Sequence, residues 1–211
     1  MSKTHPLIRV FRWGRIAVVL GLTSLAAHFW GAFTLELDLV SSVNGRSVVI
    51  GELTGYVGVF VIAAETCRPH GTWEMGWRRS QYRAVVSGAV LFATGTIPSL
   101  ICAHSLVEEF GAEVRWWVPL LNALIISAVT LLSSRVIASP HFLAVPLAII
   151  VVILTAQTLH VPGSERVFLA GYNPQISPGV NYWIVFTVAT LLFICIPIGS
   201  IDRLVKTAGY R

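Results

Sequence analysis

Long apolar runs alternate along this chain with short polar segments, and six of the runs approach the length needed to cross a bilayer. A hydrocarbon core of about 30 Å requires roughly 20 helical residues at ~1.5 Å each. The runs are apolar throughout and lack the in-and-out alternation of barrel strands, so the pattern predicts helices. We therefore predict an all-α polytopic bundle forming one membrane domain, with spans near residues 16–35, 48–64, 84–104, 116–134, 142–159 and 182–201.

The composition points to the same class of protein. Charged residues make up 12% of the 211 residues and apolar residues 55%, whereas a soluble domain has about 25% charged residues. The net charge of +5 does not indicate nucleic-acid binding, because the basic residues lie in separate short segments. Cys67, Cys102 and Cys195 have neither CxxC nor Cys/His metal spacing, which argues against a disulfide framework or a zinc site.

The distribution of basic residues predicts the orientation. If the N-terminus is cytoplasmic, 12 of the 15 Lys and Arg residues fall on the cytoplasmic side, and Arg46, Arg115 and Arg166 fall outside. Cytoplasmic segments of membrane proteins carry this excess of positive charge. We therefore predict that both termini are cytoplasmic, that residues 1–15 are a basic amphipathic lead-in and that residues 160–181 form a long outer loop.

The predicted spans are poor in ionisable groups. Four stretches contain no Asp, Glu, Lys or Arg: residues 84–107, 116–134, 142–164 and 167–201. Ion-coupled carriers usually keep an ionisable residue at depth, so this pattern disfavours ion coupling. Glu52 and Glu65 border the second span and are expected at the membrane interface. The lysines are Lys3 and Lys206, and no phosphate-binding G-x-x-x-x-G-K-[ST] loop occurs, so ATP would have to bind another subunit.

Three histidines allow a different chemistry. His28, His104 and His160 are expected toward the outer side, and histidines from different helices can hold haem or copper. An equal number is expected on the inner side, and no two lie four residues apart in one span. This even distribution favours structural histidines, with a haem- or metal-binding membrane oxidoreductase subunit as the alternative.

The cytoplasmic connection between spans two and three, residues 65–83, reads "ETCRPHGTWEMGWRRSQYR". Thr72 can cap a short helix in which Trp73 and Trp77 share a face, and indole rings favour the membrane interface. Arginines follow that can meet lipid phosphates or the carboxylates of a protein: Arg78, Arg79 and Arg83. On physical grounds alone, this segment is a lipid anchor or a docking surface for a partner.

The longer run "IAAETCRPHGTWEMGWRRSQYRAVVSGAV" resembles the corresponding segment of ABC-2 type transporter permeases. In these proteins an acidic residue ends span two, and a G-T-x-E element and a basic stretch lead into span three. The matching positions here are Glu65, Gly71, Thr72, Trp73, Glu74, Arg79, Ser80 and Arg83. The expected six spans, cytoplasmic ends and amphipathic lead-in are also similar to that family.

The resemblance implies that residues 65–83 form a coupling helix that docks on an ATP-binding cassette subunit. Glu74 and the arginines would make the electrostatic contacts, and Trp73 and Trp77 would be buried anchors. The chain would itself be neither an enzyme nor a cofactor carrier, since ATP and Mg²⁺ would sit on the partner. It would pair with a second permease subunit, identical or different, in a bacterial cytoplasmic membrane, and would export a hydrophobic or amphipathic substrate. A non-catalytic accessory or assembly protein is the remaining alternative.

Overall fold

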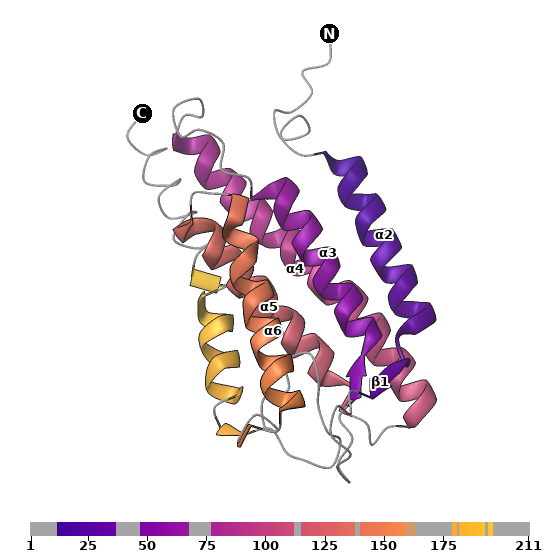
Figure 1. Cartoon of the computed structure of the whole chain (residues 1–211). Helices are drawn as coiled ribbons and strands as arrows, with labels where there is room; N and C mark the ends of the chain where they lie inside the picture. Colours follow the sequence, from indigo (N-terminus) through magenta and orange to yellow (C-terminus); the bar gives the residue numbers. More distant parts are fainter. Residues whose placement is uncertain are drawn as a thin grey trace.

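The computed structural model describes residues 12–36, 47–67, 77–111, 115–137, 140–159, 161–162, 179–180, 182–192 and 194–195. Helices dominate these ranges (Figure 1). In chain order the elements are α2 (Trp13–Trp30), β1 (Thr34–Glu36), β2 (Ser47–Val49), α3 (Ile50–Thr66), α4 (Trp77–Phe110), α5 (Trp117–Val136), the 3-10 helix η1 (Pro140–Leu143), α6 (Ala144–Thr158) and the helix Tyr182–Leu192.

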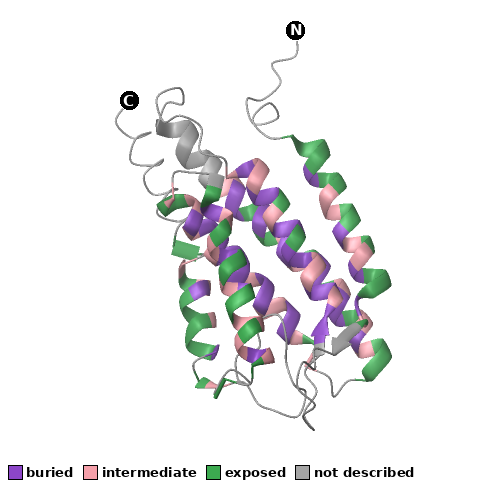
Figure 2. Cartoon of the chain, viewed as in Figure 1, coloured by how far each residue is buried: buried purple, intermediate pink, exposed green. Residues whose placement is uncertain are grey.

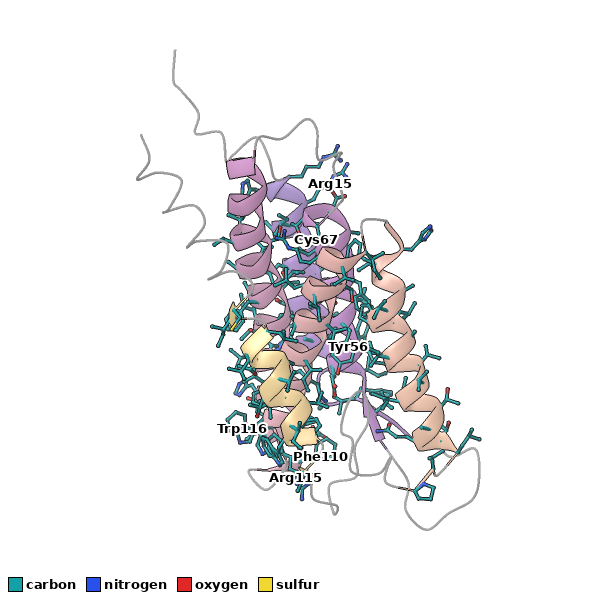
Figure 3. The ribbon with its side chains drawn as sticks, turned by 90° about the vertical axis from the view of Figure 1, so that its left-hand side faces the viewer. Arg15, Tyr56, Cys67, Phe110, Arg115 and Trp116 are labelled. Atoms are coloured by element: carbon teal, nitrogen blue, oxygen red, sulfur yellow. The ribbon has the colours of Figure 1, made fainter. Side chains whose placement is uncertain are left out.

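The first helices run in alternating directions between two ends of the bundle. At one end, Arg15 at the start of α2 pairs with Glu65 near the end of α3. At the other end, the Cys102 thiol in the second half of α4 donates to the carbonyl of Gly31, just after α2, at 3.4 Å. We call these the Arg15 end and the hairpin end. Figure 3 shows Arg15 and Cys67 toward the first end and Phe110 toward the second.

A two-stranded antiparallel sheet joins α2 to α3 at the hairpin end, which is a departure from the expected all-α fold. β1 pairs with β2 so that Leu35 faces Val48. Val48 and Val49 are buried, and β-branched residues favour the extended chain. Residues 48 and 49, expected to begin the second span, are therefore strand, and the helix begins at Ile50.

Glycines allow α3 to approach its neighbours closely. Gly51, Gly55 and Gly58 lie at helical spacing on α3, where residues four and seven apart share a face. A Cβ added to Gly51 would lie 2.7 Å from the Cα of Gly31, and one added to Gly58 would lie 3.0 Å from the Thr23 Cγ2. Close backbone contact of this kind is how helices associate in lipid, where burial of apolar surface gives little advantage.

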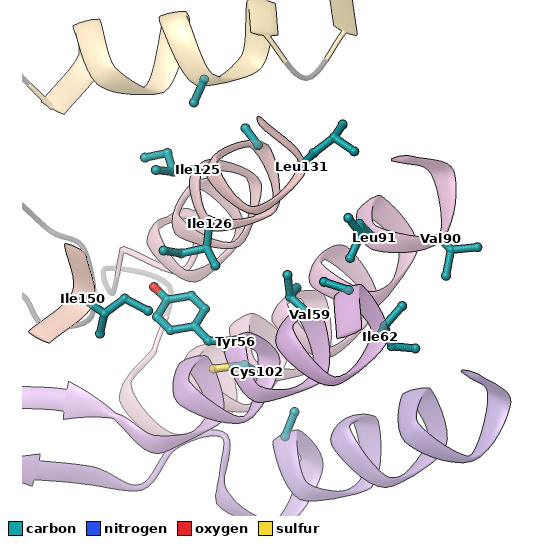
Figure 4. Packing of buried hydrophobic residues seen from close by; sticks show 14 of the residues in the cluster. Tyr56, Val59, Ile62, Val90, Leu91, Cys102, Ile125, Ile126, Leu131 and Ile150 are labelled. Carbon is teal, nitrogen blue, oxygen red and sulfur yellow. The ribbon is translucent and has the colours of Figure 1, made fainter. Parts of the chain in front are cut away.

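The apolar core lies among α3, α4 and α5 (Figure 4). Tyr56, Val59 and Ile62 of α3 are almost fully buried, as are Leu91 of α4 and Ile126 of α5. The outer faces are apolar as well. Large exposed apolar residues include Val18, Leu22, Leu25 and Phe29 of α2, Leu147, Val151 and Val152 of α6, and Ile184, Val185, Val188 and Leu191 of the Tyr182–Leu192 helix.

These exposed faces match a lipid environment rather than water. Figure 2 shows exposed residues along much of α2, α6 and the Tyr182–Leu192 helix, and buried residues concentrated toward α3 and α5. Soluble proteins seldom expose contiguous apolar surface of this extent. Three segments of the described chain are long and apolar enough to cross a membrane: Val85–Phe110, Trp117–Val136 and His141–Thr158. The predicted helical, membrane-compatible character is thus confirmed.

We predict that Gly51→Ala destabilises the protein by about 1–3 kcal/mol, because the new methyl group would press against the backbone at Gly31 and the Cys102 thiol. Gly21→Ala is the matched control, since a Cβ there meets nothing within 4 Å and alanine favours a helix over glycine by about 1 kcal/mol. Thermal unfolding of the purified full chain in detergent measures the unfolding midpoint of each variant. A Gly51→Ala midpoint at or above that of Gly21→Ala would contradict the close packing of α2, α3 and α4.

Candidate functional site

The structure describes part of the predicted coupling segment. Gly71, Thr72, Trp73 and Glu74 lie outside the described residues. Trp77, Arg78, Arg79 and Arg83 lie in the first two turns of α4, and Glu65 lies near the end of α3. Positions 79 and 83 are four residues apart and therefore share one face of this helix.

α4 is longer than a membrane crossing requires. Its 34 residues span about 50 Å, whereas its apolar part is Val85–Phe110. Residues 77–84 therefore extend the helix by about 12 Å beyond the apolar part at the Arg15 end. The sequence analysis predicted that this span starts at residue 84. In the structure the helix starts at Trp77, and the basic segment forms its first two turns. At the other end α4 stops at Phe110, because Gly111 adopts a positive φ of 84° that closes the helix.

Glu65 is the predicted site residue whose contacts the structure describes. Its Oε1 accepts a hydrogen bond at 3.2 Å from Nη1 of Arg15, in the first turn of α2. The side chain of Glu65 is 23% exposed and that of Arg15 is 61% exposed. The start of α2 and the end of α3 therefore meet at the Arg15 end. α5 ends there too, because Asn122 near its start bonds Glu52 near the start of α3 at the hairpin end.

A second polar site, missed by the sequence analysis, lies near the hairpin end. Glu52, in the first turn of α3, is 1% exposed, and Asn122 of α5 is fully buried. Nδ2 of Asn122 donates to Oε1 of Glu52 at 2.7 Å. The hydroxyl of Tyr56, one turn further along α3, donates to the same oxygen. The hydroxyl of Tyr182 donates to Oδ1 of Asn122 at 2.7 Å. We call these four residues the Glu52 cluster.

The direction of these bonds explains how a carboxyl group can be buried here. Burial of an ionised carboxylate is costly unless donors replace water. Two donors converge on one oxygen of Glu52, and Tyr182 fixes the amide of Asn122 so that its NH₂ group faces the carboxylate. The cluster thereby connects α3, α5 and the Tyr182–Leu192 helix.

Glu52, expected at the membrane interface, is buried inside the bundle. The helix begins at Ile50, so Glu52 lies in its first turn and its side chain turns between α3 and α5 rather than toward the surface. Two signals in the sequence could have revealed this. Tyr56 stands four residues after Glu52, on the same face of a helix, and Asn122 interrupts an otherwise apolar run.

Aromatic side chains surround this end of the bundle. The rings of Trp117 and Trp183 stack with centroids 5.5 Å apart, next to the Tyr182 of the cluster. Trp30, at the end of α2, and Trp116, before α5, are exposed. Indole rings gather at the boundary between hydrocarbon and water. The Glu52 cluster therefore lies at the end of the bundle that carries these four tryptophans.

The histidines do not assemble into a site in the part of the chain that is described. His28 and His104 are exposed, and His104 pairs with Glu108, one turn later in α4, at 3.2 Å. His160 lies outside the described residues. The described residues contain no group of three or more His, Cys, Asp or Glu side chains arranged to hold a metal ion.

Comparisons of the chain with protein-family models, with curated proteins and with solved structures found no match.

We predict that Asn122→Leu destabilises the protein by about 2–3 kcal/mol, because it removes one of the donors to the buried Glu52 carboxyl group. Tyr182→Phe should cost about 1 kcal/mol, since it removes one bond to a neutral amide. Ser127→Ala is the matched control on α5, because the buried Ser127 hydroxyl has no hydrogen-bond partner among the described residues. Thermal unfolding in detergent ranks the three variants. Equal midpoints for Asn122→Leu and Ser127→Ala would show that the cluster does not stabilise the bundle.

Proposed function

We propose that this chain is the membrane permease subunit of an ABC-2 type transporter, with ATP hydrolysed by a separate cassette subunit. The observation that carries the proposal is the extension of α4: its first two turns, which bear Trp77, Arg78, Arg79 and Arg83, project beyond the apolar part of a membrane-crossing helix. A rigid helical extension that carries arginines and a tryptophan suits docking on a protein, since these residue types dominate binding energy.

In the proposed topology the chain crosses the membrane six times, with both termini in the cytoplasm. Two features support α2 as a crossing helix, although it is not among the three long apolar segments named above. Trp13 and Trp30 stand at its two ends, about 26 Å apart along the axis, which is close to the thickness of a hydrocarbon core. The residues between them include Val18, Leu22 and Leu25, which are exposed. The Arg15 end is the cytoplasmic end in this proposal, because most basic residues fall there.

α3 supplies the mechanical connection in this proposal. Its Glu65 is the first residue of the coupling segment, and its Glu52 lies about 20 Å away along the same helix, in the cluster with Asn122 and Tyr182. A push from the ATP-binding subunit on residues 65–83 would move α3 as a rigid body. Because Glu52 is bonded to α5, that movement would reach the opposite end of the bundle. When ATP closes the partner subunit, its contact with residues 65–83 would differ between two conformations of the permease. This difference would favour one conformation of the outer end.

The substrate path would lie between two permease subunits, and both a homodimer and a heterodimer fit the proposal. The exposed aliphatic faces of α6 and the Tyr182–Leu192 helix suit a hydrophobic or amphipathic substrate or a second subunit. Export follows from the family resemblance.

We predict that the double variant Arg78→Glu/Arg79→Glu recovers about tenfold less ATP-binding subunit when the full chain is captured from its native membrane, as expected when interfacial charge contacts become repulsive. The control is Arg12→Glu/Arg135→Glu, which makes the same change in charge at the same end with exposed residues on α2's cap and α5. Both variants should insert at wild-type levels.

Quantitative mass spectrometry of the captured complexes measures recovery. Equal recovery from both double variants would rule out docking through α4. Capture of other membrane proteins without any ATP-binding subunit would favour the accessory or assembly role instead.

The burial of Glu52 favours a second candidate function, an ion-coupled carrier. An ionisable group inside a membrane bundle often marks a proton or cation pathway. The sequence analysis disfavoured this class because four apolar stretches contain no ionisable residue and Glu52 was expected at the membrane interface. The two candidates differ in their energy source. An ion-coupled carrier would move protons down a pH gradient without any ATP-binding subunit.

For that second candidate we predict that proteoliposomes containing the chain alone dissipate an imposed pH gradient faster than empty liposomes, and that Glu52→Gln abolishes the difference. A pH-sensitive dye inside the vesicles measures the rate. Glu108→Gln, which changes an exposed carboxylate of α4, is the control. Identical rates for wild-type, Glu52→Gln and empty vesicles would eliminate the ion-coupled candidate and leave the ABC permease unaffected.

A further inference from the structure

A groove of about 270 Å³ runs between α2 and α3 at the Arg15 end. Its walls are aliphatic, formed by Val18 and Val19 of α2 and by Val61 and Ile62 of α3. Val18 and Val61 are exposed in the bundle, so the groove opens toward the surroundings rather than into the core.

The mouth of the groove carries both signs of charge. Arg15 and Glu65 line it and pair at 3.2 Å. A guanidinium has several N–H donors, and one nitrogen faces Glu65, so most of the exposed Arg15 side chain stays accessible. Gly14 also lines the groove, and a Cβ there would meet nothing within 4 Å, which leaves room beside the ion pair.

We propose that this groove binds a phospholipid with a phosphoethanolamine headgroup. The lipid phosphate accepts hydrogen bonds from Arg15, the lipid ammonium donates to Glu65, and one acyl chain lies along the aliphatic walls. The inference depends on insertion of the chain in a membrane and does not depend on the proposed transport function.

Charge complementarity selects this headgroup over the other common ones. Phosphatidylglycerol offers a phosphate to Arg15 but has no cation for Glu65, so its negative charge meets that carboxylate. Phosphatidylcholine has a cation, but its trimethylated nitrogen has no N–H to donate. A primary ammonium next to a phosphate matches both members of the ion pair, and charge-assisted hydrogen bonds are the stronger kind.

The position of the groove fits a lipid from the adjacent leaflet. Trp13, in the same turn of α2 as Arg15, is 41% exposed, and an indole ring at a helix end marks the headgroup level. From Arg15, the aliphatic walls lead toward the middle of α2, so the acyl chain would run along the membrane normal as it does in the bilayer.

The experiment uses the full chain in nanodiscs that contain equal amounts of phosphatidylethanolamine, phosphatidylglycerol and phosphatidylcholine with identical acyl chains. Native mass spectrometry of the released protein measures the retained lipids. We expect phosphatidylethanolamine to be retained about fivefold over each of the others, as one additional headgroup hydrogen bond would give. Arg15→Gln and Glu65→Gln should each abolish this selectivity.

A second pair of variants does not touch the ion pair. Val18→Trp fills the groove and should lower retention of phosphatidylethanolamine to the level of the other lipids. Val152→Trp, on the exposed face of α6, should leave retention unchanged. Because both positions are exposed, both variants should fold.

Three outcomes would overturn the proposal. The first is equal retention of the three lipids by the wild-type protein. The second is a preference for phosphatidylglycerol that survives Glu65→Gln, which would indicate a simple anion site at Arg15. The third is selective retention that appears only after residues 1–11 are removed, which would mean that the chain's own lead-in occupies the groove.

Discussion

The hydrogen bond from Asn122 to Glu52 constrains the arrangement of the hairpin end. A carboxyl group that is 1% exposed needs donors, and the structure supplies them from Tyr56 on its own helix and from Asn122 on α5. Asn122 can reach Glu52 only if α3 and α5 keep one rotation and one height relative to each other. The requirement extends to the Tyr182–Leu192 helix, because Tyr182 orients the Asn122 amide. One buried carboxyl group therefore fixes the register of three helices.

The physics of a lipid environment explains why cohesion takes this form. Apolar side chains gain little by leaving lipid for protein, so helices associate through close backbone contact and through polar bonds. α3 uses both devices along its length. Its glycine face approaches Gly31 and Thr23, its first turn holds the Glu52 cluster, and Glu65 near its last turn pairs with Arg15. These contacts make α3 the central helix of the described bundle and the element best placed to carry movement from one end to the other.

Part of this structure was predictable from the pattern of apolar residues. Where the structure describes them, the apolar runs are mostly helical, because each is long enough for several turns. The bounds of α4 were predicted less well. Residues 77–83 include arginines and aromatic residues, so a rule based on apolarity begins the span at residue 84. The backbone hydrogen bonds of a helix do not require apolar side chains, and the helix begins at Trp77. Val48 and Val49 extend the second run in sequence but are a strand, because pairing with β1 decides their conformation. The burial of Glu52 was not predicted, for a related reason. Periodicity places a residue on a face but does not reveal that Asn122, 70 residues later, lies opposite.

α6 and the Tyr182–Leu192 helix bury less of their surface in the bundle than α5 does. In the most apolar 18-residue stretch of Trp117–Val136, 61% of the residues are buried, whereas 22% are buried in its counterpart, His141–Thr158. Among the described residues of the Tyr182–Leu192 helix, Tyr182 and Ala189 are buried, while Ile184, Val185 and Val188 are exposed. Since apolar contact gives little cohesion in lipid, this helix depends on the Tyr182 bond to Asn122 and on the stacking of Trp183 with Trp117. Elements with few buried contacts separate at low cost. A conformational change would therefore move this helix away from α5 before it disturbs the glycine contacts of α2, α3 and α4.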